Sequence, residues 1–140
     1  MRIAQLFRHP VKGLRPEALA RASLLPQRGV AGDRAFAFQF TDESVPEALR
    51  APSPQDTPWM SKAHLAVQHD WPELAQWIPE LDLARSVLKL SGPSGFRCEA
   101  SYLTPQGRET LSTVIHDFLS RSTPFERARH PVVAPLRLIG

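Results

Sequence analysis

The sequence predicts a mainly β protein with two helices, arranged as a small β-barrel of six to seven strands. Three observations favour this fold class. Short segments of alternating hydrophobicity recur along most of the chain, turn residues separate them, and the one clear amphipathic helix comes late, near residues 105–121. Many short strands divided by turns are typical of small barrels, which such a helix would cap. All 140 residues are expected to form a single domain.

The first third of the chain contains three predicted strands, at residues 2–8, 17–25 and 34–41. The first ends before Pro10, because proline cannot continue a central strand. The third has the strongest pattern, since Phe36, Phe38 and Phe40 alternate with small or polar residues. We expect these three rings in the core. Arg34 shares their parity, so it either lies at the wet rim of the core or holds an anion.

The middle of the chain is less regular. Residues 41–58 carry four prolines and little hydrophobic periodicity, which indicates a surface loop. Residues 59–68 are predicted to form a strand. Asp70 is expected to cap a short helix, whose apolar face contains Leu74 and Trp77.

The last third combines a hairpin, a helix and a final apolar segment. Residues 86–91 and 96–102 are predicted as strands about a Gly-Pro-Ser-Gly turn. Thr104 and Pro105 open the amphipathic helix, with threonine as the cap and proline in the first turn. Its predicted buried stripe consists of Leu111, Val114, Ile115, Phe118 and Leu119. Residues 132–139 are apolar and strand-like.

The charge balance fits a small anionic partner at least as well as a nucleic acid. The net charge is +3, and fourteen arginines but only three lysines supply the positive side chains. Arginine makes forked contacts to phosphate or carboxylate. The phenylalanine row could stack bases, but its alternation indicates a core, so we do not expect nucleic-acid binding. We read neither a signal peptide nor a membrane span in the sequence and expect a cytoplasmic protein without membrane contact.

The residues that most often carry catalysis or bind metals have plainer interpretations here. Cys98 is the single cysteine and lies on the apolar parity of its strand, which predicts a packed side chain rather than a nucleophile. The five histidines show no metal-ligand spacing, so no metal site is expected. Ser112 and His116 are four residues apart on the helix, but nothing near them in the sequence supplies an oxyanion hole. We therefore expect no catalytic residue.

Two motifs, Pro-Val-Lys-Gly-Leu-Arg at residues 10–15 and Gly-Val-Ala-Gly-Asp-Arg at residues 29–34, resemble the amino-terminal β-barrel domain of the MOSC family. This family is named after the carboxy-terminal domain of molybdenum cofactor sulfurase. Its members typically read YPVKS after the first strand and GLxGDRxW at the third. The resemblance implies that Lys12 and Arg34 contact the anionic pterin of the molybdenum cofactor. It also implies cofactor contacts for Gly13, where the family commonly has serine, and for Lys62, which loosely matches a further family arginine.

The resemblance implies an accessory domain that contacts the cofactor and is not catalytic alone. The family's catalytic cysteine lies in the MOSC domain that follows the barrel, and Cys98 does not match it. That domain is expected to be absent from this chain and to act as a partner in cis or in trans. Joined to it, the chain would belong to a molybdenum-cofactor-dependent oxidoreductase or a sulfur carrier. The alternative is a stand-alone β-barrel that serves as a binding or structural module without cofactor.

The residues themselves do not decide whether the anion site exists. Asp33 and Arg34 could form a local structural pair, with Lys12 a solvated turn residue. If the site exists, Lys12 and Arg34 should converge at one rim of the barrel. We expect the first and third strands to run antiparallel there, because Lys12 follows the end of one and Arg34 opens the other.

Overall fold

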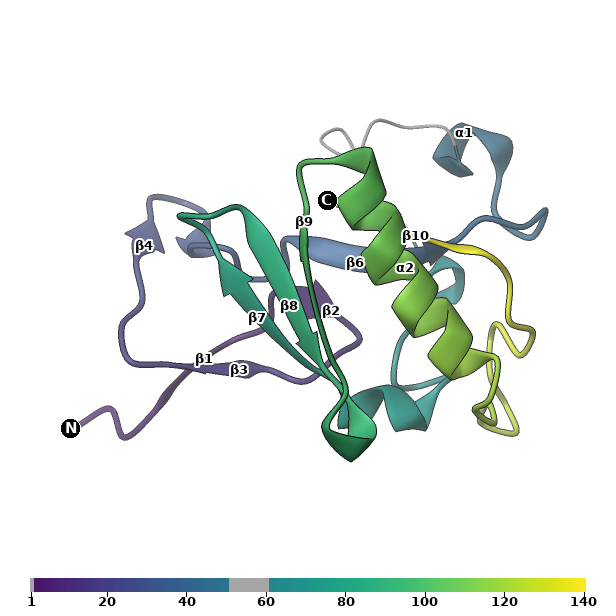
Figure 1. The fold of residues 1–140 in the computed structure, drawn as a ribbon, viewed down its shortest axis with the longest axis horizontal. Helices are drawn as coiled ribbons and strands as arrows, with labels where there is room; N and C mark the ends of the chain where they lie inside the picture. Colours follow the sequence, from purple (N-terminus) through teal and green to yellow (C-terminus); the bar gives the residue numbers. More distant parts are fainter. Residues whose placement is uncertain (1, 51–60) are drawn as a thin grey trace.

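The computed structural model describes residues 2–50 and 61–140, which adopt a mainly β fold with two α-helices (Figure 1). Within these residues the strands form four separate small sheets. No closed barrel is found among them, so the predicted barrel is not confirmed. Each of the two amino-terminal hairpins forms a two-stranded sheet of its own, apart from the two three-stranded sheets.

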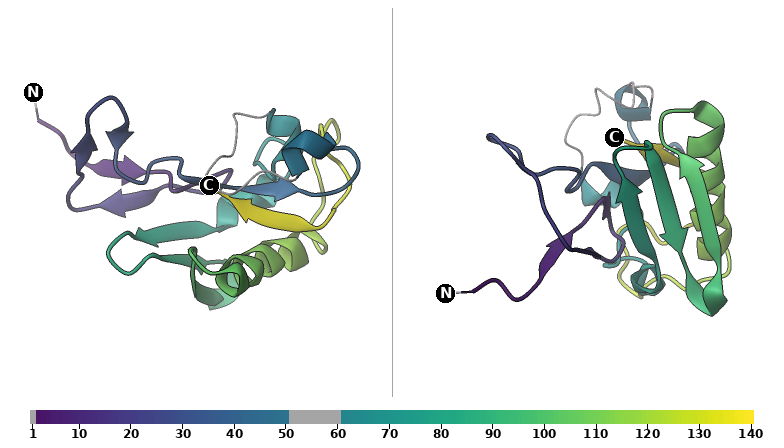
Figure 2. Two further views of the ribbon diagram at one scale, coloured as in Figure 1. Left: turned by 90° about the horizontal axis from the view of Figure 1, so that it is seen from above. Right: turned by 60° about the vertical axis from the view of Figure 1, so that its left-hand side comes forward.

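The amino-terminal hairpins extend away from the body of the protein (Figure 2). Strand β1 (Leu6–Arg8) pairs antiparallel with β3 (Glu17–Leu19), and β4 (Leu24–Leu25) pairs with β5 (Gly29–Val30). The predicted strand at 2–8 is therefore shorter, and the one at 17–25 breaks in two. Most side chains of these hairpins, the amino-terminal arm, are exposed. The strands stay short because few of their residues pack against the core.

The central sheet has the order β10-β6-β2. Strand β6 (Phe36–Phe40) pairs parallel with β2 (Val11–Lys12) and antiparallel with β10 (Leu136–Ile139). The three phenylalanines of β6 are buried, as predicted. The intervening Ala37 and Gln39 are buried too, because the other face of the strand is covered as well.

A second sheet and a helix complete the core. Strands β7 (Ile78–Asp82), β8 (Val87–Ser91) and β9 (Arg97–Ser101) form an antiparallel sheet. Helix α2 (Pro105–Leu119) packs against β9 and β10, and Thr104 accepts a hydrogen bond from the Gly107 N–H as the predicted cap. Both three-stranded sheets and α2 contribute to one hydrophobic cluster.

Three predictions in the middle of the chain are wrong or incomplete. Residues 61–68 contain the 3₁₀ helix η2 (Lys62–His64) and one bridge from Leu65 to Gln39 instead of a strand, and 59–60 lie outside the described residues. The segment after Asp70 is the 3₁₀ helix η3 (Pro72–Gln76), with Trp71 at the N-cap position and no side-chain capping hydrogen bond. Asp70 accepts from the Arg129 backbone N–H instead, at 3.1 Å.

Helix α1 (Glu47–Arg50) occupies part of the predicted loop at 41–58, whose remainder from residue 51 lies outside the described residues. None of the helices in residues 2–50 and 61–140 has both the length and the apolar character of a membrane span.

Candidate anion-binding site

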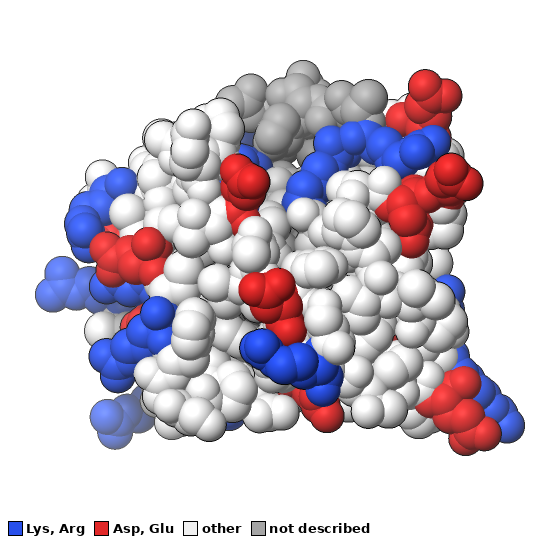
Figure 3. All heavy atoms as spheres, turned by 45° about the vertical axis from the view of Figure 1, so that its right-hand side comes forward, with Lys and Arg blue, Asp and Glu red and all other residues white. Residues whose placement is uncertain are grey.

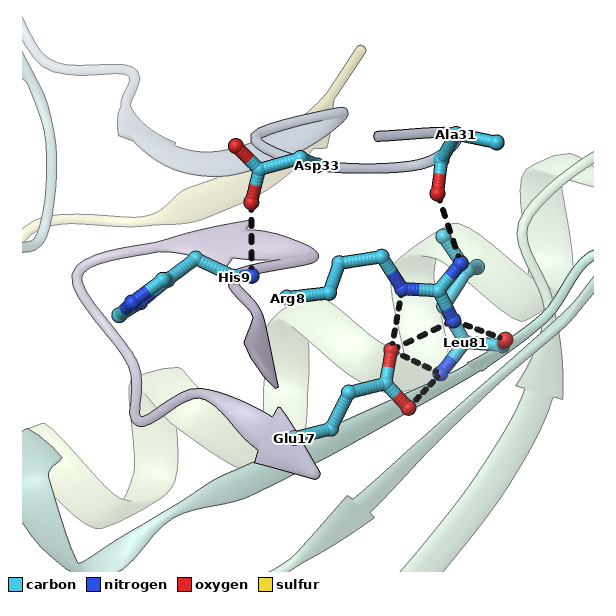
Figure 4. Close-up of polar contacts among 6 residues, drawn as sticks. All are labelled: Arg8, His9, Glu17, Ala31, Asp33 and Leu81. Atoms are coloured by element: carbon cyan, nitrogen blue, oxygen red, sulfur yellow. Dashed lines mark hydrogen bonds and ion pairs between the residues drawn. The ribbon is translucent and has the colours of Figure 1, made fainter. Parts of the chain in front are cut away.

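Parallel pairing of β2 with β6 joins the two motifs that the sequence singled out. The Arg34 N–H donates to the His9 carbonyl oxygen at 2.6 Å, and the Phe36 N–H donates to that of Pro10 at 3.0 Å. The Asp33 carboxylate accepts from the His9 N–H at 2.8 Å (Figure 4). The predicted first and third strands do not pair with each other in the described residues: β1 pairs antiparallel with β3, and β6 pairs parallel with β2. The motifs meet because the chain turns after β1 and starts a second short strand beside β6.

Arg34 does not begin the buried face of β6. Its backbone has a φ of 51°, in the left-handed region, and its side chain is exposed. The strand starts two residues later, at Phe36, so Arg34 lies outside β6 and does not share the buried face of the phenylalanines. Among the described contacts, Asp33 bonds to the backbone of His9 and forms no ion pair with Arg34. The aspartate therefore holds the turn, and the arginine side chain points to solvent.

Three of the predicted site residues come together. The pKa of Lys12 is lowered, first by partial burial and then by repulsion from Lys62 and Arg34. Such repulsion acts only between charges that lie close together. Lys12 belongs to β2, Arg34 to the turn before β6 and Lys62 to η2, so three separate segments bring cations into one neighbourhood.

Gly13 explains how η2 reaches this neighbourhood. The φ of Gly13 is 94°, and a Cβ there would lie 2.4 Å from the Ala66 carbonyl oxygen and 3.0 Å from the Val67 Cα. Only glycine permits this approach of two backbones. The chain just after η2, at Ala66, is thereby packed against the residue that follows Lys12. The serine that the family commonly has at this position would not fit here.

A buried ion pair that the sequence analysis missed anchors the turn carrying Arg34 (Figure 4). The Arg8 Nε donates to Glu17 at 2.6 Å, and its two terminal nitrogens donate to the carbonyl oxygens of Ala31 and Leu81 at 2.8 and 2.7 Å. Both charged side chains are less than one-tenth exposed. The pair ties together the arm, the 29–34 motif and β7. The ion pair could have been predicted only from the register of β1 against β3, and local sequence does not define that register.

Other reactive side chains serve packing or the backbone. Cys98 packs against the core, and burial raises the pKa of its thiol. Ser112 is buried, donates to the Arg108 carbonyl oxygen at 2.7 Å and accepts from the Leu138 N–H at 2.8 Å, which ties α2 to β10. No group of three or more potential metal ligands occurs in the described part of the chain.

Asp42, Ser44 and His130 form a polar cluster that the sequence analysis also missed. Both the Ser44 hydroxyl and the Asp42 carboxylate lie 3.1 Å from the same ring nitrogen, Nε2 of His130. The other nitrogen, Nδ1, is buried without a partner. A serine–histidine–aspartate triad uses the two nitrogens for different partners. This arrangement is therefore a structural clamp on the buried His130, whose ring stacks on Phe40.

The charged side chains on the face drawn in Figure 3 are interspersed, with acidic groups beside basic ones on a largely uncharged surface. A polyanion requires a continuous basic stripe, and the described residues form none on this face. No family model matches the chain, and neither a curated protein nor a solved structure is significantly similar to it. The MOSC resemblance stays a prediction.

Proposed function

We propose that this chain binds a phosphate-bearing small molecule among Lys12, Arg34 and Lys62. The occupant in this proposal is the anionic pterin of the molybdenum cofactor, held between this domain and a MOSC domain in cis or in trans. The observation that carries the proposal is geometric: β2 pairs with β6, and Gly13 closely approaches Ala66, so the segments that carry Lys12, Arg34 and Lys62 come together.

The residue chemistry suits the phosphate end of such a ligand. Arg34 offers a planar fork of donors, and the two lysines act as point charges. Cys98 packs against the core, so the proposal does not use it as a ligand for the metal. This chain would therefore position the cofactor, and the partner domain would supply metal ligation. By itself the chain is an accessory domain.

The barrel architecture and a cytoplasmic location belong to the same proposal. The barrel is supported by the single core that the two three-stranded sheets share.

The affinity of the chain alone should be low. Each charge-assisted hydrogen bond contributes about 1.5–3 kcal/mol, and association costs at least about 4 kcal/mol. Even three contacts at the upper value therefore leave about 5 kcal/mol, which corresponds to a dissociation constant of about 0.2 mM or weaker.

A phosphate titration followed by amide chemical shifts tests the site. We expect saturating shifts clustered at residues 11–14, 33–35 and 61–63. Arg34→Ala should abolish them, whereas Arg28→Ala, which removes an exposed arginine from the turn between β4 and β5, should not. Shifts scattered over the surface, or equal in both variants, would contradict the site.

A second experiment tests the identity of the occupant. The chain is produced in a host that makes the molybdenum cofactor, with and without a MOSC domain supplied in trans, and bound pterin is measured by fluorescence after denaturation. We expect pterin retention only with the partner domain, and less in Arg34→Ala than in Arg28→Ala. Phosphate binding without any pterin retention would keep the anion site and exclude this occupant.

A further inference from the structure

We propose that a pocket beside the carboxy-terminal half of α2, lined by aromatic rings, binds a compact organic cation such as an alkylammonium group. The pocket has a volume of about 580 Å³ and is lined by residues of η3, the β8–β9 turn and α2. It shares no residue with the anion site, so the failure of one proposal would not affect the other.

Three aromatic rings form the walls of this pocket. Phe96 and Phe118 both meet Trp77 edge-on, with ring centroids 5.8 and 5.3 Å away and interplanar angles of 69° and 79°. Trp77 is only 3% exposed, whereas Phe96 is 47% exposed despite its size. Trp77 is thus covered by its neighbours, and Phe96 is the exposed ring of the pocket. A cation placed over the face of an exposed phenyl ring is attracted by its quadrupole.

The turn that carries Phe96 is fitted to Trp77. A Cβ at Gly92 would lie 2.6–2.8 Å from three carbons of the Trp77 six-membered ring, so only glycine lets the turn close over the indole. The Gly92 N–H donates to the Phe96 carbonyl oxygen at 2.9 Å, and Phe96 in turn donates to Pro93 at 3.1 Å. The exposed ring is therefore held by a hydrogen-bonded turn.

The charge of the lining selects a cation. Two carboxylates, of Glu73 and Asp117, line the pocket against one guanidinium, of Arg121. The chain as a whole carries a net charge of +3, so this pocket is negative on a positive protein. Aromatic faces and excess carboxylate together recognise an ammonium head rather than an anion or a neutral ring.

Choline is the probe, followed by chemical shifts of the Trp77 indole N–H and of residues 92–96. Its uncharged isostere 3,3-dimethylbutan-1-ol tests the charge. Nα-acetyl-trimethyllysine amide carries the same head on a peptide-like group and separates a free metabolite from a protein side chain as the source. We expect saturable choline binding in the millimolar range and at least threefold weaker binding of the neutral alcohol. Tighter binding of the lysine derivative than of choline would indicate a peptide source.

Phe96→Leu is the decisive variant, because it keeps apolar volume and removes the ring at an exposed position. It should weaken choline about two- to fivefold and leave the neutral alcohol unchanged. Phe7→Leu, at a similarly exposed phenylalanine on the arm, is the matched control and should change neither. Equal affinity for choline and the alcohol, no saturable choline shifts, or unchanged choline binding in Phe96→Leu would overturn the proposal.

Discussion

Removing the carboxylate of Glu17 should destabilise the protein far more than removing an exposed one. Glu17→Ala leaves the Arg8 guanidinium buried without its counter-charge and deprives the Leu81 N–H of its acceptor at 3.2 Å. Breaking a buried ion pair from one side costs about 3–5 kcal/mol. Glu99→Ala is the control, because the Arg85–Glu99 pair is 60% and 43% exposed. Such exposed pairs contribute about 0–1 kcal/mol.

Urea unfolding and thermal unfolding, both followed by circular dichroism, compare the two variants with the parent. For 140 residues, the entropy of unfolding is about 0.3 kcal/mol/K, so Glu17→Ala should lower the melting temperature in the thermal experiment by about 10–17 °C. Because Arg8 also holds the Ala31 carbonyl oxygen, amide shifts at residues 31–34 should move in Glu17→Ala and stay in place in Glu99→Ala. A loss below about 1 kcal/mol, or equal losses in the two variants, would refute the anchoring role.

Three further predictions concern the core, the motif and acid stability. Phe38→Ala should cost about 3–5 kcal/mol in urea unfolding, since the ring is fully buried, and a cost below about 1 kcal/mol would place it outside the core. Gly13→Ala should cost more than Gly29→Ala, because both have a positive φ but only the first Cβ meets the backbone; equal unfolding midpoints would contradict the close approach. Burial raises the pKa of Asp70, but hydrogen bonds from neighbours including Arg129 outweigh it and lower the pKa. A lowered pKa contributes stability above the unfolded value of about 3.9 that is lost as the pH falls through the folded value. Asp70→Asn should therefore be less stable than the parent at neutral pH, and a gap that stays constant from pH 7 down to acid unfolding would contradict this.

Local signals in the sequence predicted the elements that depend on local physics. The alternation in β6 and the threonine cap of α2 are properties of neighbouring residues, and both are confirmed. Strand β7 was missed because Pro79 interrupts its pattern. Proline is tolerated there, since β7 is an edge strand with β8 as its one neighbour in the sheet. That position in the sheet is not encoded locally.

Asp70 shows how a tertiary contact overrides a local signature. The Asp-Trp-Pro-Glu sequence matches a helix start. However, the Asp70 carboxylate bonds to Arg129, which is 59 residues away in the chain. The cap position passes to Trp71, and the segment forms a 3₁₀ turn instead of an α-helix.

The parallel pairing of β2 with β6 also determines what kind of anion site is possible. Val11 is level with Phe36 and Lys12 with Ala37, so Arg34 lies level with His9, three residues from Lys12. Lys12 and Arg34 therefore stem from different levels of the paired segments and are not directly opposite each other. An anion must therefore be reached by two long side chains, with Lys62 from η2 as a third point of contact. Ordering such side chains costs entropy on binding, which is why the proposed site needs a partner domain to hold its ligand tightly.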